Sequence, residues 1–240
     1  MLPSFTNLAT GRQAKIMIRP FVLAAAIFLG CLSGSISAKE LKCEDCSVVI
    51  YGTEPQDVLD GCEAVKSAAR FFVPLGLSIP EGVSIELMEA QHASLLAAHE
   101  TGNYDAQKNA IRILTYRAAV KATEANEQGL GRIATRTHWR SYIVHELAHT
   151  AIHAGCGVAC PSRAIHEYVA AVAQLASLPA KELGELLIPY RNLEPFQHLS
   201  EITEIYYAIN PHYFAAKSYK HYQQQSDPAA FLRRVLAPSD

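Results

Sequence analysis

The stretch Ser141-Tyr-Ile-Val-His-Glu-Leu-Ala-His-Thr150 contains the pattern H-E-x-x-H. Residues four apart on a helix lie one turn apart on the same face, so His145 and His149 can bind one small cation together. Glu146 lies about 100° around such a helix from His145, and its carboxylate can reach a water on the metal without being a ligand. The pattern therefore predicts a zinc site with a general base beside it.

The flanking residues favour a helix with one buried face. Thr137 is the expected N-cap and Gly155 the expected end. Apolar side chains that would pack inward recur opposite the motif, at Trp139, Ile143, Val144, Leu147 and Ala151. The other face carries His138, Tyr142, His145, His149 and His153. A helix whose histidines lie at the surface, or are satisfied in the core without a metal, is the alternative.

The motif and the residues after it resemble the zincin metallopeptidases, which place H-E-x-x-H on a central helix and add a third ligand later. The metzincin branch needs Gly and His where this chain has Ile152 and Gly155, so that branch is excluded. The gluzincin branch takes a Glu from a following helix, and Glu167 stands eighteen residues after His149. The resemblance makes Glu167 the third zinc ligand. It covers two helices and implies no particular substrate.

The segment around Glu167 favours a helix that packs closely against another. Ser162 can cap it, and it is expected to run to about Ser177. One side is apolar, with Ile165, Val169, Val172 and Ala176. Glu167 lies on the other side, among Ala164, Ala170 and Ala171. A carboxylate among alanines predicts a buried charge that needs a partner such as a metal. A half-exposed Glu is the alternative, and His166 is a rival ligand that points about 100° away.

Two further roles of the gluzincin pattern remain open. Some gluzincins have a carboxylate four residues after the ligand Glu, but this chain has Ala171 there, so Glu201 and Glu204 are candidates on spacing alone to orient a histidine. Gluzincins often supply a Tyr or His from the C-terminal lobe to stabilise the oxyanion. Spacing does not select among the candidates, which are Tyr206, Tyr207, His212, Tyr213, Tyr219, His221 and Tyr222.

Length and composition predict a globular chain without a nucleic-acid partner. At 240 residues, half of them hydrophobic, it can bury a core as one domain or two lobes. The net charge is −2, and no basic run is interleaved with aromatic residues. The predicted fold class is α+β, with a small mixed β-sheet lobe over 39–136 and a helical lobe over 137–240 that carries the metal site. The resemblance makes these lobes one zincin-like domain.

Periodicity places the elements coarsely. The expected strands are 47–51, 83–87 and 110–116. Helices are expected at 57–72, 90–100, 181–187, 198–209, 211–224 and 228–236, with a turn at 104–109. A strand beside the cleft of a zincin often pairs with an extended substrate. Residues 111–116 are the candidate for that strand, and an ordinary internal strand is the alternative.

Residues 1–38 are expected to be an export signal. Three basic residues precede the apolar run 21–32, and small residues lead to a cleavage site after Ala38. Translation from Met17 would leave a signal of more ordinary length. An uncleaved anchor and a lipoprotein site at Cys31 are the alternatives. The expected location is the periplasm or the medium, with no transmembrane span after signal removal.

Export makes disulfides the expected state of the cysteines. The expected pairs are Cys156 with Cys160, and Cys62 with either Cys46 or Cys43. The first would close a small loop between the two metal helices. Without Cys31 five cysteines remain, so at least one thiol is expected to be free. A redox or zinc C-x-x-C at 43–46 is the alternative.

The sequence therefore predicts an exported zinc-dependent enzyme, a hydrolase of the metallopeptidase type that acts on a peptide or protein. His145, His149 and Glu167 would hold Zn²⁺, and Glu146 would be the catalytic base that takes a proton from water and delivers it to the leaving amine. Two alternatives stay open. One is a zinc-binding domain without catalysis, and the other is a disulfide-stabilised interaction domain without a metal.

Overall fold

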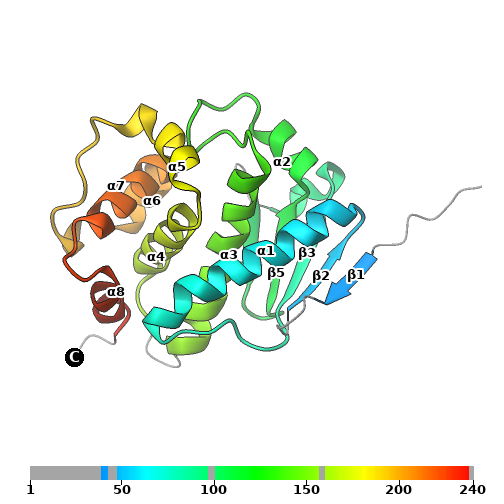
Figure 1. Cartoon of the computed structure of the whole chain (residues 1–240), viewed down its shortest axis with the longest axis horizontal. Helices are drawn as coiled ribbons and strands as arrows, with labels where there is room; N and C mark the ends of the chain where they lie inside the picture. The colour runs from blue at the N-terminus through cyan, green and yellow to red at the C-terminus, as the bar shows by residue number, and fades with distance from the viewer. Residues whose placement is uncertain (1–38, 43–47, 97–100, 157–159, 238–240) are drawn as a thin grey trace, which may run out of the picture. The chain divides into compact units, whose positions relative to one another are not determined.

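The computed structural model describes residues 39–42, 48–96, 101–156 and 160–237, all of which belong to one compact unit. Within them the fold is α+β, as predicted, with a mixed sheet in the N-terminal half and helices beyond it (Figure 1). The predicted export signal and the cysteines 31, 43 and 46 lie outside the described residues.

Within the described residues the sheet has five strands in the order β1-β2-β3-β5-β4. They are β1 (Lys39–Lys42), β2 (Val49–Gly52), β3 (Ser84–Met88), β4 (Gly102–Asp105) and β5 (Ala110–Leu114). The three central strands run parallel to one another, and β1 and β4 are antiparallel to their neighbours. β2, β3 and β5 correspond to the three predicted strands. The predicted turn at 104–109 is too long, because residues 104 and 105 belong to β4 and only 106–109 turn.

β5 also ends earlier than expected. The hydroxyl oxygen of Thr115 accepts a hydrogen bond from the Ala118 amide and caps α2 (Tyr116–Thr123), which the sequence did not reveal. Because β5 lies between β3 and β4, the prediction that it presents a free edge to a substrate is wrong. β4 is the outer strand on that side of the sheet.

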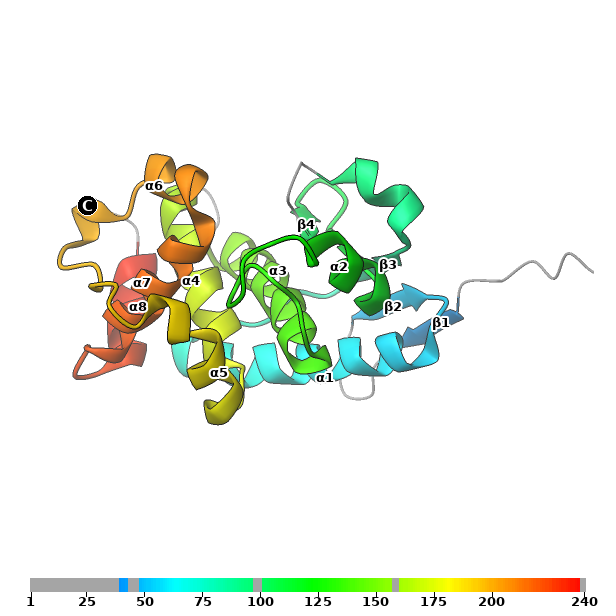
Figure 2. The same ribbon diagram turned by 90° about the horizontal axis from the view of Figure 1, so that it is seen from above.

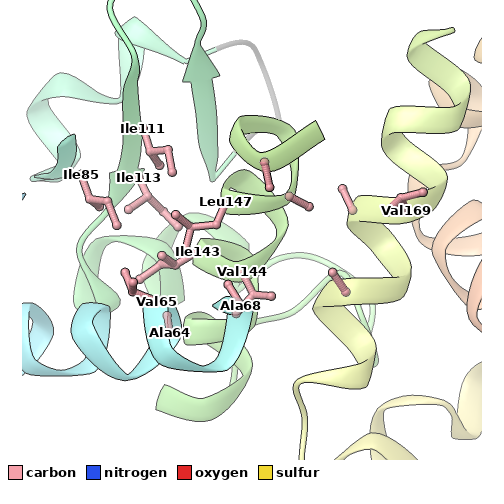
Figure 3. Packing of buried hydrophobic residues seen from close by; sticks show 14 of the residues in the cluster. Ala64, Val65, Ala68, Ile85, Ile111, Ile113, Ile143, Val144, Leu147 and Val169 are labelled. Carbon is pink, nitrogen blue, oxygen red and sulfur yellow. The ribbon is translucent and has the colours of Figure 1, made fainter. Parts of the chain in front are cut away.

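Helices α1 (Pro55–Phe72) and α3 (Arg136–Cys156) pack against the sheet and enclose the core with it. Figure 3 shows Ile111 and Ile113 of the sheet next to Ile143 and Leu147 of α3. Each of these side chains is fully buried, and burial of one such side chain contributes about 1.5–3 kcal/mol. The intervening strand positions face the other way, where Arg112 pairs with Glu86 at 3.3 Å. One face of the sheet is therefore core, and the other carries this ion pair.

The helix with the H-E-x-x-H motif is buried as predicted on its apolar side, where Trp139, Ile143, Leu147 and Ala151 are all 0% exposed. The indole nitrogen of Trp139 donates to the Leu114 carbonyl at 2.9 Å and ties α3 to β5. The predicted ends were wrong by one or two residues. The Thr135 hydroxyl, rather than that of Thr137, accepts from the His138 amide, and Gly155 lies inside the helix.

The start of α3 is tied to α1 by charge. Asp57 and Asp60 are 2% and 6% exposed, and the Arg136 guanidinium lies 2.8 and 2.7 Å from their carboxylates. Asp57 also accepts from the Tyr116 amide at 2.9 Å, which fixes the start of α2 to the same point. Buried carboxylates are tolerated only with such partners. This cluster therefore sets where α3 begins.

The remaining helices lie beyond α3, on the side away from the sheet (Figures 1 and 2). They are α4 (Arg163–Ala176), α5 (Ala180–Leu186), α6 (Glu204–Ile209), α7 (Pro211–Gln223) and α8 (Pro228–Leu236). Short 3-10 segments occupy Val73–Leu75, Ala90–Leu95, Ile188–Tyr190 and Leu199–Glu201. The helix expected at 198–209 is thus two pieces. Among the helices in the described part of the chain, none has the length and apolar character needed to cross a bilayer.

α4 packs against α3 and matches its prediction closely. Ser162 caps it through the Ile165 amide, and Ser177 is its C-cap. Ala164, Ala170 and Ala171 are at most 3% exposed, so the predicted close approach of another helix is confirmed. Ala176, expected in the apolar stripe, is exposed. α7 covers α4 from the other side, where the Tyr168 hydroxyl and the His221 Nδ1 lie 3.0 Å apart.

Candidate metal centre

Helices α3 and α4 bring His145, His149 and Glu167 together. Glu167 Oε2 lies 3.3 Å from His145 Nε2 and 3.7 Å from His149 Nε2, and the three donor atoms all lie within 4.8 Å of one another. Ligands about 2.0–2.2 Å from a tetrahedral zinc ion are about 3.3–3.6 Å apart. The residues that the sequence predicted as ligands therefore have a spacing that a single small cation can bridge.

The buried carboxylate of Glu167 fits such an ion. The residue is 6% exposed, although the alternative of a half-exposed Glu was open from the sequence. Its Oε2 atom is buried and faces the Nε2 atoms of His145 and His149, but no contact to it among the described residues has hydrogen-bond geometry. A buried oxygen without a donor is costly. A cation between Oε2 and the two imidazoles would satisfy it.

The protonation states of Glu167 and His149 are those that metal ligands need. Burial alone would raise the pKa of Glu167, but the close approach of the His145 imidazole, the charges of both histidines and the nearby Tyr207 hydroxyl lower this pKa to about 2. Burial lowers the pKa of His149 to about 3, and His145 acts in the same direction. Near neutral pH, without an ion, Glu167 is thus charged and His149 neutral, as metal ligands must be.

His145 is the exception, because it keeps a proton more readily. Burial lowers its pKa, but the Glu167 carboxylate, whose Oε2 lies 3.3 Å from Nε2, and the charge of Glu146 outweigh that effect, so the pKa is raised. The proton on the nitrogen that faces Glu167 occupies the place that a cation would take. Metal binding is therefore expected to release it.

Gln174 orients His145. Its Oε1 lies 3.1 Å from His145 Nδ1, so the ring can donate through Nδ1 and turn Nε2 toward Glu167. The prediction of Glu201 or Glu204 for this role is wrong. Glu201 accepts instead from the backbone amides of Gln197 and His198, and Glu204 is exposed. The signal in the sequence was the position of Gln174 two helical turns after Glu167, which places both on one face.

Among the Tyr and His candidates for stabilising the oxyanion, Tyr207 is the one that lies against Glu167. It lines the same cavity as Glu146 and the three ligand candidates, and its hydroxyl lies close enough to Glu167 to lower the pKa of that carboxylate. Burial, followed by the negative charge of Glu167, raises its pKa, so the hydroxyl keeps its proton. Of the other candidates, His221 is paired with Tyr168. Spacing could not select Tyr207, because its position depends on how α6 packs against α4.

Two cavities share these residues in their walls. One of about 460 Å³ is bounded by β4, α3, α4 and Tyr207. The other, of about 730 Å³, runs between α3, α4 and the start of α7, and its walls include Tyr142, Leu175 and Tyr213. Both are lined by His145, Glu146 and Tyr207. Glu146, which is 8% exposed, thus borders both cavities.

The outer strand β4 forms one wall of the smaller cavity, through Gly102, Asn103 and Tyr104. The Thr101 carbonyl accepts from the Leu114 amide, so Thr101 points its backbone toward β5. Backbone direction alternates along an antiparallel strand, and the amides and carbonyls of Gly102 and Tyr104 therefore point away from β5. This edge can accept an extended peptide.

The cysteines next to the site are paired as expected. Cys156 and Cys160 form a disulfide between the end of α3 and the start of α4. Cys62 is disulfide-bonded too, and both of its predicted partners lie outside the described residues. His166, the rival ligand, stacks on His149 with ring centroids 6.1 Å apart. It does not belong to the group of His145, His149 and Glu167.

A protein-family model matches residues 48–239, and its description is a family of unknown function (DUF6639). The matched span contains β2 to α8 and hence all four residues of the candidate site. No curated protein and no solved structure matches the chain.

Proposed function

The chain belongs to this family of unknown function, DUF6639, so its activity must be inferred from its own residues, and we propose that it is a zinc-dependent peptidase of zincin-like fold. The observation that carries the proposal is the convergence of His145, His149 and Glu167 within 4.8 Å, with Glu146 in the same cavity. Two imidazoles and one carboxylate are a donor set of catalytic zinc sites, which leave one position open. When bound there, zinc would lower the pKa of a water toward 7 and polarise a carbonyl.

The residues around the ligands have complementary roles in this proposal. The carboxylate of Glu146 takes a proton from the attacking water and passes it to the leaving nitrogen. The protonated hydroxyl of Tyr207 donates to the carbonyl oxygen of the substrate as negative charge develops on it. Gln174 keeps the His145 ring in the orientation that presents Nε2.

The shape of the cleft favours a polypeptide over a small amide. The edge of β4 offers main-chain hydrogen bonds on one side, and the larger cavity offers an apolar and aromatic recess for a side chain on the other. The export signal expected at residues 1–38 would place this activity in the periplasm or outside the cell.

The test starts with metal analysis of the full chain purified without a histidine tag, followed by hydrolysis of a denatured protein with and without a chelator. We expect one zinc ion per chain and hydrolysis that the chelator stops. Glu146→Gln should keep the zinc and lose roughly 10²–10⁴-fold in turnover, since it removes general acid–base catalysis. His149→Ala should lose both.

Other outcomes would favour the alternatives. Zinc without hydrolysis of any polypeptide would indicate a metal-binding domain that is not catalytic. Protein that contains no zinc and takes up none would indicate an interaction domain held by its disulfides. Unchanged turnover of Glu146→Gln would refute the role given to that residue.

A further inference from the structure

A second group of metal-ligating side chains lies beside the candidate zinc site. Cys156, Cys160 and His166 each offer one ligand atom, and these atoms all lie within 4.8 Å of one another. Cys156 ends α3, Cys160 lies just before α4, and His166 is in the first turns of α4. Cys160 is exposed and the other two are half-buried, so the group can be reached from solvent.

We propose that reduction of the Cys156–Cys160 disulfide turns this group into a second metal site, which takes a borderline-soft divalent cation such as Zn²⁺. Two thiolates and one imidazole are donors that such ions prefer, whereas calcium and magnesium prefer oxygen. The disulfide and the ion exclude each other, because sulfur in an S–S bond is not a thiolate ligand. The chain then holds metal here only when reduced.

The chemistry of the switch is that of thiol–disulfide exchange. A dithiol reductant gives two electrons and two protons to the S–S bond, which becomes two thiols while the reductant becomes a disulfide. A divalent cation that binds Cys156 and Cys160 then displaces the two thiol protons. Removal of the ion and oxidation restore the S–S bond.

The donors should stay close after reduction. The S–S bond joins residues only four apart, so it restrains the unfolded chain little. α3 and α4 are held together by buried contacts elsewhere, among them those of Val144, Ala148 and Val169. Either link, sulfur–sulfur or sulfur–metal–sulfur, would tie the same two segments.

The new site is separate from the proposed catalytic one. The two ligand sets have no residue in common, although His166 stacks on His149 with an angle of 15° between the rings. The catalytic set contains only nitrogen and oxygen donors, and the new one contains two sulfurs. A probe that reports sulfur ligation therefore distinguishes them, whatever the fate of the proposed peptidase activity.

The experiment is a Co²⁺ titration of the full chain, either oxidised or reduced with a phosphine under anaerobic conditions. We expect the reduced protein to show thiolate-to-cobalt charge-transfer absorption and to bind one more ion than the oxidised protein. The double variant Cys156→Ser/Cys160→Ser should lose both signals while it keeps Cys43, Cys46 and Cys62. His166→Ala should weaken binding of the extra ion by at least about tenfold, since even losing a partner of a ligand costs that much.

His149→Ala is the matched control, because it disturbs the catalytic set and should leave the charge-transfer band intact. Circular dichroism before and after reduction shows whether the fold persists. The proposal is overturned if the reduced wild-type chain gives no band, or if the band survives in the double serine variant.

Discussion

At the scale of single residues, the amide of Gln174 has the most specific task, because it is the acceptor that fixes the His145 ring. We predict that Gln174→Leu lowers zinc affinity by about 10–100-fold, as loss of the hydrogen-bond partner of a metal-ligating histidine does. Gln174→Glu keeps an acceptor at the same place and should retain most of the affinity. Competition against a chromophoric chelator measures both. A leucine variant with wild-type affinity would contradict the role.

The shifted pKa values of the site predict how acid affects the metal-free protein. Glu167 has a pKa near 2 against an ordinary 4.5, so its contribution to stability is present above pH 4.5 and is lost as the pH falls through about 2. His149 has a pKa near 3 against 6.5, so the unfolded chain binds the extra proton between these values. The free energy of unfolding therefore decreases on acidification below pH 6.5 because of His149, and below pH 4.5 because of Glu167 as well.

His145 acts in the opposite direction. Its raised pKa adds stability that is full below 6.5 and is lost as the pH rises through the folded value. We therefore predict that replacing His149 by Asn reduces the loss of stability between about pH 6.5 and pH 4, because one of the two acid-sensitive groups is gone. Denaturant unfolding of both metal-free proteins at the two pH values measures this. An equal loss in the two proteins would show that His149 is not responsible.

At the scale of elements, β4 is proposed to bind substrate through its backbone. Tyr104→Pro removes a backbone amide that points away from β5, so no hydrogen bond between the two strands is lost. Proline is tolerated at such a position of an edge strand. We predict a rise in KM for an extended peptide with little change in the temperature of unfolding. Tyr104→Ala is the control for the side chain, which lines the cavity. Asn103→Pro, whose amide points toward β5, should destabilise the sheet instead. Equal KM values for the proline and alanine variants would contradict the proposed backbone contact between β4 and the substrate.

The elements that the sequence predicted well are those with local signals. α4 begins and ends where Ser162 and Ser177 suggested. β4 was missed because Gly, Asn and Asp rarely favour a strand, and its extended form depends on pairing with β5. The helix expected at 198–209 is divided because Thr203 accepts from the Tyr206 amide and starts a new helix there. Thr115 acts in the same way before α2.

At the scale of the whole molecule, the sequence predicted the ligand set but not its surroundings. His145 and His149 follow from a motif within one helix, and Glu167 followed from a family resemblance and the alanines beside it. The sequence could place Gln174 on the same helix face as Glu167 but not against His145, and it could not select Tyr207, because these contacts form only once α3, α4 and α6 are packed. Local periodicity carries no information about that packing.

An ion shared by α3 and α4 should stabilise the entire fold. Saturation at about 100 times Kd adds about 2.7 kcal/mol to the free energy of unfolding if the unfolded chain does not bind. We predict that a chelator lowers the unfolding temperature of the wild-type protein, as measured by calorimetry. The His149→Ala variant should not respond, and Cys156→Ser/Cys160→Ser should still do so. A wild-type chain that is indifferent to chelation would contradict the bridging ion.

The salt links between Arg136 and α1, together with the S–S bond at Cys156, secure α3 at its two ends. With both ends held, α3 cannot slide along its axis, so the distances from its two imidazoles to Glu167 on α4 are set before any ion binds. Calcium takes 6–8 oxygen ligands at about 2.3–2.6 Å, and it would meet nitrogens that cannot spread to admit it. The preference for a small cation would then come from the ion pairs of Arg136 and from the disulfide, neither of which contacts the ion.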